Sequence, residues 1–190
     1  MKKLKKKLFI LITPLLQTIF MFIPKFVLNY IWGIFDSYES NLALLFRNLY
    51  VQKYAKKYNG FIFIGKYVTI KNIQYISFGE NISIHAYCYI EGYGEVFIGN
   101  NVSIANHSII ISSNHTWNDL DLPIKYNPVT KETIIIKDDV WIASNVKILG
   151  GVVISKRNVI AAGAVVTKDT IENSIYAGVP AKLIKNINME

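Results

Sequence analysis

The sequence of 190 residues contains a single cysteine, Cys88. A single thiol excludes an internal disulfide framework, and its place two residues before Ile90 predicts a small buried core residue. Acidic residues are scarce near the N-terminus. Residues 1–60 hold ten Lys or Arg and two acids (10 − 2 = +8), whereas residues 61–190 hold eleven of each. Because the whole basic excess lies in the first 60 residues, the rest of the chain is not expected to bind nucleic acid.

Aliphatic residues recur at every sixth position from Ile136 to Val166, a period that fits neither an α-helix nor an amphipathic strand. A hexapeptide period predicts a parallel β-helix, in which each unit forms one side of a triangular prism and about three units complete a coil. Gly, Asn and Asp between the units favour tight corners. The predicted inward positions are Phe78, Ile84, Ile90, Ile98, Ile104, Ile110, Ile136, Ile142, Ile148, Ile154, Ile160 and Val166.

The repeat is interrupted twice. Ile90 and Ile98 are eight residues apart, with Glu91 at the start of the extra residues, and Ile110 and Ile136 are 26 apart. The second interruption is polar and aromatic and contains His115. Interruptions of a solenoid map to loops, and such loops often carry function, so we predict a catalytic loop over about residues 112–134.

Residues 1–60 are predicted to form a basic and apolar helical extension, followed by a β-helix domain at 61–186 and a tail at 187–190. Five lysines between positions 2 and 7 precede an apolar run at 8–23. As a helix this run would reach about 24 Å, short of the ~30 Å hydrocarbon core of a bilayer. We therefore expect contact with the inner leaflet of a membrane. A cleaved signal peptide is less favoured, because no small-residue cleavage site follows, and a helical cap on the β-helix stays open.

The end of the extension has apolar residues at helical spacing. We predict one amphipathic helix from Asn41 to Tyr58 that ends at Asn59-Gly60. Its predicted inward residues are Leu42, Leu45, Leu49 and Gln52. Its predicted outward residues are Arg47, Lys53, Lys56 and Lys57.

Three motifs in the last third of the chain carry a resemblance. They are Asp139-Val-Trp-Ile142, the run from Ala161 to Asp169, and Ala177-Gly-Val-Pro-Ala-Lys182. Over residues 62–186 the chain resembles the hexapeptide-repeat acyltransferases, in particular maltose and galactoside O-acetyltransferases and polysaccharide O-acetyltransferases. The N-terminal 60 residues resemble the extension of capsule and O-antigen modifying enzymes. The resemblance implies a mainly β, left-handed parallel β-helix, a homotrimer with active sites between subunits, acetyl-CoA as acyl donor, and no metal.

The resemblance also implies roles for individual residues. His115 matches the loop histidine that acts as general base, because a neutral imidazole can accept the proton of a sugar hydroxyl near pH 7. Glu91 is predicted to orient that imidazole or to hold the acceptor. The other acceptor-side candidates are His85, Tyr93, Asn114 and Trp117.

Acetyl-CoA contacts are implied along the later coils. The candidates are Trp141, Ala143, Ser144, Ala162, Thr167, Lys168, Lys182 and Lys185, with the lysines placed for the phosphates. The family usually has Gly at 143, 155 and 161, where this chain has Ala143, Ser155 and Ala161. We expect the backbone there still to offer N–H and C=O groups to pantetheine.

Together these features predict an acetyl-CoA-dependent O-acetyltransferase acting on a capsule, O-antigen or lipid-linked saccharide, in the bacterial cytoplasm on the inner face of the membrane. An amino sugar as N-acetyl acceptor stays open, because the same base would serve. A γ-type carbonic anhydrase would need three imidazoles around zinc, and the chain has three histidines, His85, His107 and His115. A non-catalytic solenoid anchored to a membrane is the third alternative.

Overall fold

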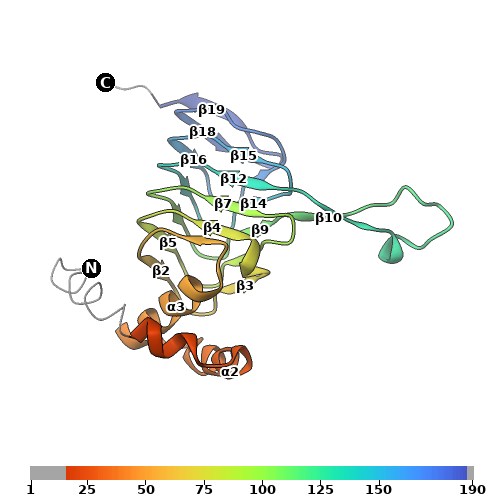
Figure 1. Ribbon diagram of the computed structural model, residues 1–190. Helices are drawn as coiled ribbons and strands as arrows, with labels where there is room; N and C mark the ends of the chain where they lie inside the picture. The colour runs from red at the N-terminus through yellow and green to blue at the C-terminus, as the bar shows by residue number, and fades with distance from the viewer. Residues whose placement is uncertain (1–15, 188–190) are drawn as a thin grey trace.

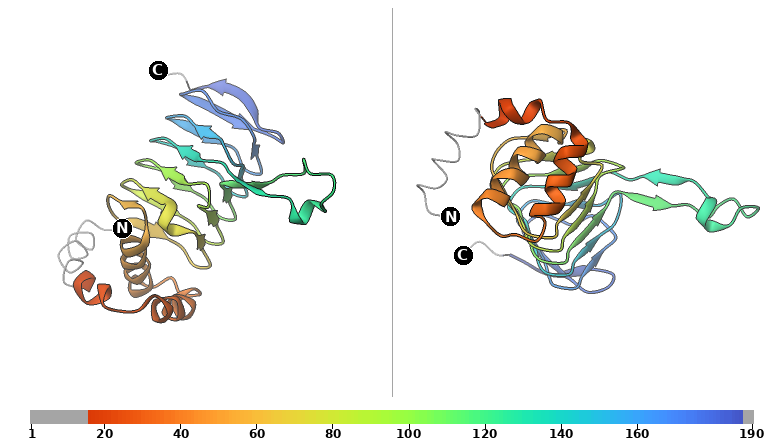
Figure 2. Two further views of the ribbon diagram at one scale, coloured as in Figure 1. Left: turned by 45° about the vertical axis from the view of Figure 1, so that its right-hand side comes forward. Right: turned by 90° about the horizontal axis from the view of Figure 1, so that it is seen from below.

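The structure, a computed structural model, describes residues 16–187 as a parallel β-helix with helices at its N-terminal end (Figure 1). Figure 2 shows the stacked coils from the side and their triangular outline from below. Sheet 1 contains β1 (Lys57–Tyr58), β4 (Ile76–Phe78), β7 (Val96–Ile98), β12 (Ile134–Ile136) and β15 (Val153–Ile154). Sheet 2 contains β2 (Ile62–Ile64), β5 (Ile82–Ile84), β8 (Ser103–Ile104), β13 (Trp141–Ile142), β16 (Asn158–Ile160), β18 (Ser174–Ala177) and β19 (Lys182–Asn186). Sheet 3 contains β3 (Thr69–Lys71), β6 (Tyr89–Glu91), β9 (Ile109–Ile111), β14 (Lys147–Ile148) and β17 (Val165–Val166).

The predicted inward positions form the core of the prism. Every one of them is at most 3% exposed. Parallel pairing stacks equivalent residues of successive coils, as with Ile84 on Ile104 and Ile142 on Ile160. The corner residues Asn81, Asn101 and Asp139 have φ values of 54°, 55° and 59°, the left-handed conformation that Asn and Asp tolerate. The hexapeptide β-helix prediction is therefore confirmed.

Cys88 is buried in this core, as predicted, with 1% of its surface exposed. Its Sγ donates to the carbonyl oxygen of Ala105 at 3.1 Å. Burial raises the pKa of the thiol to about 11, so the side chain is neutral at physiological pH.

Helix α3 (Asn41–Tyr54) closes the N-terminal end of the prism by supplying polar groups to the edge strand β2. The Asn48 side chain accepts from the N–H of Ile62 at 2.9 Å and donates to its carbonyl at 2.7 Å. Arg47 Nη1 donates to the carbonyl of Ile64 at 3.0 Å. These bonds satisfy backbone groups that have no neighbouring strand on that side.

Two predictions for this helix are wrong. It ends at Tyr54, and Lys57 and Tyr58 belong to β1, which pairs with β4. Arg47, predicted to lie outside, is 2% exposed, whereas Leu42, predicted to lie inside, is 61% exposed. The periodicity misled because α3 is covered on two sides, by the first coil and by α2 (Lys25–Phe35).

One long insertion leaves the prism between β9 and β12. It opens and closes with an antiparallel pair, β10 (Ser113–His115) and β11 (Val129–Lys131), and carries a short 3₁₀ turn, η2 (Ile124–Tyr126). Residues 112–133, called the arm from here on, project sideways from the middle of the solenoid (Figure 1). The predicted interruption between Ile110 and Ile136 is thus extruded chain.

The two ends of the solenoid differ. The C-terminal end closes with the antiparallel pair β18–β19, and a second 3₁₀ turn, η1 (Ile73–Tyr75), lies in the first coils. The lysines at positions 2–7 and the first half of the apolar run at 8–23 lie outside the described residues, as do residues 188–190 of the tail. Within residues 16–187, no helix is both long and apolar enough to cross a membrane.

Candidate active site

The root of the arm is fixed to the prism by hydrogen bonds between adjacent coils. Ser112 is fully buried, and its hydroxyl donates to the carbonyl of Glu91 at 2.8 Å while accepting from the N–H of Gly94 at 2.9 Å. On the returning strand, Glu132 N–H donates to the carbonyl of Ser112 at 2.8 Å. A Cβ on Gly94 would lie 2.0 Å from the Ser112 oxygen, so only glycine permits this approach. The arm therefore leaves the prism in one defined direction.

Glu91 strengthens that root. Its carboxylate, in a residue 9% exposed, accepts hydrogen bonds from Ser113 Oγ at 3.0 Å, from the N–H of Tyr93 and from the side chain of Asn72 at 3.4 Å. The Tyr93 ring lies under Lys131 Nζ, which is 4.9 Å from its centroid. Of the three partners of the carboxylate, Ser113 belongs to the arm, and the imidazole of His115 is not among them. The proposal that Glu91 orients His115 stays a prediction, whereas its contact with β10 is observed.

His115 is the last residue of β10 and pairs in register with Val129. Its side chain is exposed, as are those of Asn114 and Trp117, the latter with 66% of its surface open. Three predicted residues thus lie together on a stiff two-stranded arm. An exposed imidazole held away from the body can meet an acceptor that approaches from outside the chain.

The predicted pantetheine residues lie on a different side of the prism. Trp141 points outward from β13 in sheet 2 and is 53% exposed, with Ser103 and Val159 as its register partners. Ala143 and Ser144 form the corner that follows β13, and Ala162 lies on the same corner one coil later, where Gly163 N–H donates to the Ser144 carbonyl at 2.9 Å. Small side chains beside an exposed indole leave room for a narrow, extended ligand.

The backbone of this region does not offer the free donors that we expected. The N–H of Ala143 donates to the carbonyl of Ile160 at 2.9 Å, and that of Ala161 donates to Tyr176 at 2.8 Å. The N–H of Ser155 donates to Thr170 Oγ1 at 2.8 Å. The carbonyl of Ala143 accepts from Ser108 Oγ at 3.0 Å. For these three residues the expectation of free N–H groups is wrong, because bonds to the neighbouring coil already use them. The expectation that carbonyl groups contact pantetheine stays a prediction.

The predicted phosphate-binding residues gather near the C-terminal end of the solenoid. Thr167 and Lys168 follow β17, and Lys182 and Lys185 lie on β19. All four side chains are exposed, so the charges of the three lysines can meet an anion.

The structure therefore divides the predicted residues into two groups that one chain does not bring together. The arm leaves between sheets 3 and 1, whereas Trp141 stands on sheet 2, the remaining side of the prism. His85, predicted on the acceptor side, lies on the corner after β5, in line with Ala143, and its ring is 5.4 Å from that of Phe63. A site that uses both His115 and Trp141 requires a second copy of the chain.

The three histidines are also separated. His107 follows β8 and stacks on Tyr87 at 4.8 Å, whereas His115 is on the arm. Within residues 16–187, no group of three His, Cys, Asp or Glu side chains could hold a metal ion. This arrangement gives the carbonic anhydrase alternative no support.

An aromatic ladder on the corner after sheet 2 was not predicted from the sequence. Tyr67 stacks on Tyr87 with centroids 5.0 Å apart, and Tyr87 stacks on His107. All three have positive φ, at 55°, 63° and 63°. The signal was an aromatic ring at one corner position in three successive coils, 67, 87 and 107.

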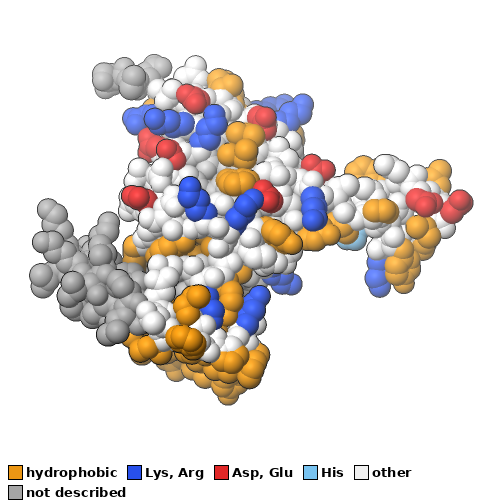
Figure 3. All heavy atoms as spheres, in the orientation of Figure 1, with side chains coloured by type: hydrophobic (Ala, Val, Ile, Leu, Met, Phe, Trp, Pro, Cys, Tyr) orange, Lys and Arg blue, Asp and Glu red, His pale blue; other side chains and the backbone are white. Residues whose placement is uncertain are grey.

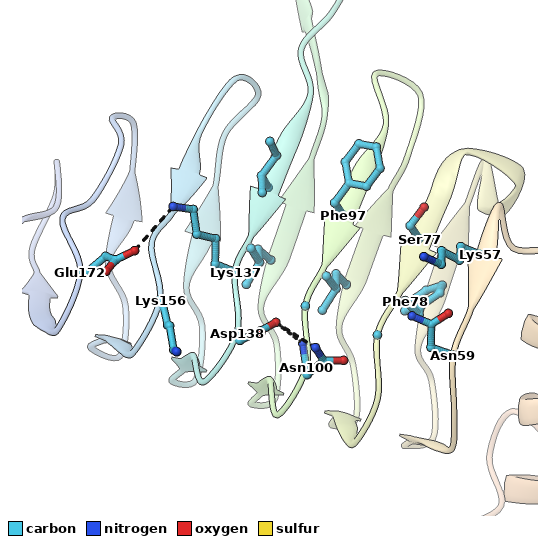
Figure 4. A pocket seen from close by; sticks show the side chains of 15 residues that line it. Lys57, Asn59, Ser77, Phe78, Phe97, Asn100, Lys137, Asp138, Lys156 and Glu172 are labelled. Atoms are coloured by element: carbon cyan, nitrogen blue, oxygen red, sulfur yellow. Dashed lines mark hydrogen bonds and ion pairs between the residues drawn. The ribbon is translucent and has the colours of Figure 1, made fainter.

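A groove on the outer face of sheet 1 was missed as well (Figure 4). Its volume is about 400 Å³, and Phe97 and Ile135 line it together with Lys57 and Lys156. Lys137 pairs with Glu172 at 3.7 Å along its edge. It shares no residue with the predicted site, and its lysines come from separate coils, which hides them in the sequence.

Comparisons with known proteins agree with the hexapeptide-repeat fold. The bacterial transferase hexapeptide (six repeats) family matches residues 133–168. The chain is 35% identical over 136 residues to galactoside O-acetyltransferase of Escherichia coli K12, covering 67% of this chain and 65% of that protein. It is 31% identical over 122 residues to the putative lipopolysaccharide biosynthesis O-acetyl transferase WbbJ of the same organism, covering 60% and 62%. The chain thus spans less than two thirds of either relative.

A solved structure of galactoside acetyltransferase in complex with coenzyme A has a TM-score of 0.76 at 27% identity, covering 86% of this chain and 80% of that one. The protein is therefore a left-handed hexapeptide-repeat β-helix with an N-terminal helical extension, and in sequence and fold it is similar to the hexapeptide-repeat acyltransferases.

Proposed function

We propose that this protein is an acetyl-CoA-dependent O-acetyltransferase that acts on a hydroxyl group of a saccharide. The observation that carries the proposal is an exposed imidazole, His115, on an arm whose root is fixed by buried hydrogen bonds. The similarity to galactoside O-acetyltransferase, and to a solved galactoside acetyltransferase bound to coenzyme A, supports the same chemistry.

In the proposed reaction His115 acts as general base. The neutral imidazole takes the proton of the sugar hydroxyl as its oxygen attacks the thioester carbonyl. The resulting tetrahedral oxyanion collapses, the C–S bond breaks, and the CoA sulfur leaves with the proton returned by the imidazolium. The products are an O-acetyl saccharide and free CoA. Trp141 would pack on the pantetheine arm, and Lys168, Lys182 and Lys185 would pair with phosphates.

We further propose that the active unit is a homotrimer with sites between subunits. The separation of His115 from Trp141 within one chain supports this arrangement. So do the large apolar side chains that the arm exposes, among them Leu120 at 93%, Ile124 at 65% and Tyr126 at 66%. Apolar surface of this kind favours contact with another protein surface, here the neighbouring subunit.

The proposed acceptor is a capsule, O-antigen or lipid-linked glycan at the inner face of the bacterial cell membrane. The similarity to a protein named for lipopolysaccharide biosynthesis supports this class. An amino sugar remains the alternative acceptor within the same chemistry, because an amine would be deprotonated by the same imidazole.

The test is release of CoA from acetyl-CoA by the full-length protein against a panel of oligosaccharides and amino sugars. Product analysis by mass and by alkali lability separates O-esters from amides. If no saccharide supports turnover and CoA causes no thermal shift, a non-catalytic solenoid is favoured. Metal analysis of the purified protein addresses the carbonic anhydrase alternative.

Subunit complementation tests the trimer. Chains carrying His115→Ala and chains carrying Trp141→Ala are co-expressed and assayed at low acetyl-CoA. If each site takes its arm from one subunit and its indole from the next, random mixing restores about a quarter of the sites. Activity no higher than that of the separate variants would place both residues of a site in one chain.

A further inference from the structure

Helix α2 is apolar on two sides, which is unusual for a helix at a protein surface. One side packs on α3: Leu28 is fully buried, and Trp32 stacks against Tyr50 with centroids 4.9 Å apart. The other side presents Phe26, Tyr30 and Ile34, which are 75%, 74% and 51% exposed. Their spacing of four residues places them in one stripe along the helix.

Exposed apolar side chains also precede α2. Residues 16–21 are helical, and Ile19 and Phe22 are 58% and 84% exposed. We call Ile19, Phe22, Phe26, Tyr30 and Ile34 the apolar end face. In Figure 3 hydrophobic side chains gather at this end of the molecule, over α2 and opposite the C-terminal end of the solenoid.

Two cations, the buried Arg47 and the half-buried Lys53, hold this face in place. Lys53 Nζ donates to the carbonyls of Phe20, Met21 and Ile23 at 3.1, 3.2 and 2.8 Å. At the other end of α2, Arg47 Nη2 donates to the carbonyls of Phe35, Asp36 and Tyr38 at 2.7, 3.2 and 2.9 Å. The exposed stripe is therefore part of the folded end of the molecule.

We propose that the apolar end face docks on an anionic lipid surface. Residues 1–35 contain six lysines and no acid, so the part of the sequence that carries the stripe has charge of one sign only, and it is positive. Aromatic and aliphatic side chains beside lysines are the composition with which helices bind the headgroup region of anionic membranes. A second copy of this chain would bring two such basic segments together, which like-charge repulsion disfavours.

The position of the apolar end face in the fold also supports docking on a lipid surface. α2 lies across the end of the solenoid and not along a side of the prism (Figures 1 and 2). In the proposed trimer, prisms joined side by side around a parallel axis would point all three end faces in one direction. Three weak contacts with one lipid surface then combine into stronger attachment.

Docking in this way also narrows the class of saccharide that can be the acceptor. This inference rests on the proposed function. The arm leaves after the third coil, about 10 Å beyond the first coil, and the helical layer adds about 10 Å. The root of the arm would stand about 20 Å from the lipid surface. The acceptor would be a membrane-anchored glycan modified within a few sugars of its lipid.

Co-sedimentation of the full-length protein with vesicles tests the surface without any need for activity. We expect binding to phosphatidylglycerol–phosphatidylcholine vesicles, weaker binding at high salt, and much weaker binding to phosphatidylcholine alone. The triple variant Phe26→Gln, Tyr30→Gln, Ile34→Gln should lower the bound fraction at least about tenfold, because three apolar contacts are lost. The matched control replaces three exposed apolar residues at the C-terminal end of the solenoid, Ile171→Gln, Leu183→Gln and Ile184→Gln, and should bind as wild type.

Equal binding by the two triple variants, or no vesicle binding by the wild-type protein, would overturn the proposal. A wild-type assembly larger than a trimer that reverts in the end-face variant, with no lipid binding, would also overturn it in favour of self-association. Since lipid binding is measured without acetyl-CoA, its loss is distinguishable from failure of the acetyltransferase function. Circular dichroism of the variants verifies that both are folded.

Discussion

In the coils every predicted inward aliphatic is at most 3% exposed, whereas in the arm Trp117, Leu120 and Tyr126 are 66%, 93% and 66% exposed. The coils bury their apolar surface against preceding and following coils, so each is stabilised within the chain. The tip of the arm is organised by polar contacts instead. Asn127, 4% exposed, bonds to both backbone groups of Asp119 at 3.0 and 3.1 Å.

This difference indicates a division of labour between the two regions. The prism provides rigidity, and in the proposed trimer the arm would carry an imidazole to the surface of a neighbouring subunit. Substitutions in the coils should therefore act on folding, and substitutions in the arm should act on catalysis or assembly.

Replacing the imidazole of the arm should give the largest change. His115→Asn should lower kcat about 10²–10⁴-fold, the usual contribution of a general base, with little change in melting temperature because the side chain is exposed. His107→Asn is the matched control, since it removes an exposed imidazole from the prism and Asn tolerates its φ of 63°. The measurements are steady-state acetyl transfer and thermal unfolding. Equal loss in both variants would contradict the assignment of the base.

Truncating a core side chain should lower stability, whereas the His115 variant lowers turnover. Ile142→Ala removes a fully buried side chain between two coils and should cost about 2–5 kcal/mol of unfolding free energy. Leu120→Ala, at the tip of the arm, should change the unfolding free energy of the chain by less than about 0.5 kcal/mol. Denaturant unfolding measures both, and size-exclusion chromatography reports whether Leu120 contributes to assembly. A core variant as stable as wild type would mean that the coils do not depend on this stacking.

The coils between Phe78 and Val166 could be predicted from the sequence. Apolar residues at every sixth position can all be buried together only in a β-helix. The position of His115 on extruded chain followed from the 26-residue gap in the same register. The burial of Arg47 could not be read, because it depends on which backbone carbonyls the first coil leaves unpaired. The hydrogen bonds of the Ala143 and Ser155 N–H groups could not be predicted either, because their acceptors lie in the neighbouring coil. The pairing of Glu91 with Ser113 likewise exists only once the arm has its direction.

The root of the arm connects the two regions and should give an intermediate effect. Gly94→Ala would place a Cβ 2.0 Å from the Ser112 oxygen and 2.3 Å from the Glu132 nitrogen, so both arm strands must shift. We expect a cost of about 1–3 kcal/mol and a loss of kcat greater than that stability change explains. Gly33→Ala is the control, because a Cβ there meets nothing within 4 Å in helix α2. Unchanged turnover in Gly94→Ala would show that the direction of the arm does not matter for catalysis.

The smallest expected effect is a loss of unfolding free energy at alkaline pH, caused by Cys88 in the coils. Burial raises the pKa of Cys88 from 9.0 to about 11, so the folded chain holds the thiol proton more tightly than the unfolded chain does. The corresponding stabilisation is complete below pH 9 and is lost as the pH rises toward 11, by about 1 kcal/mol at pH 10. We expect the unfolding free energy of the wild type to fall more steeply between pH 8.5 and 10 than that of Cys88→Ala. Parallel slopes for the two proteins would show that the thiol does not titrate differently in the coil, since tyrosines and lysines that titrate in the same range are common to both.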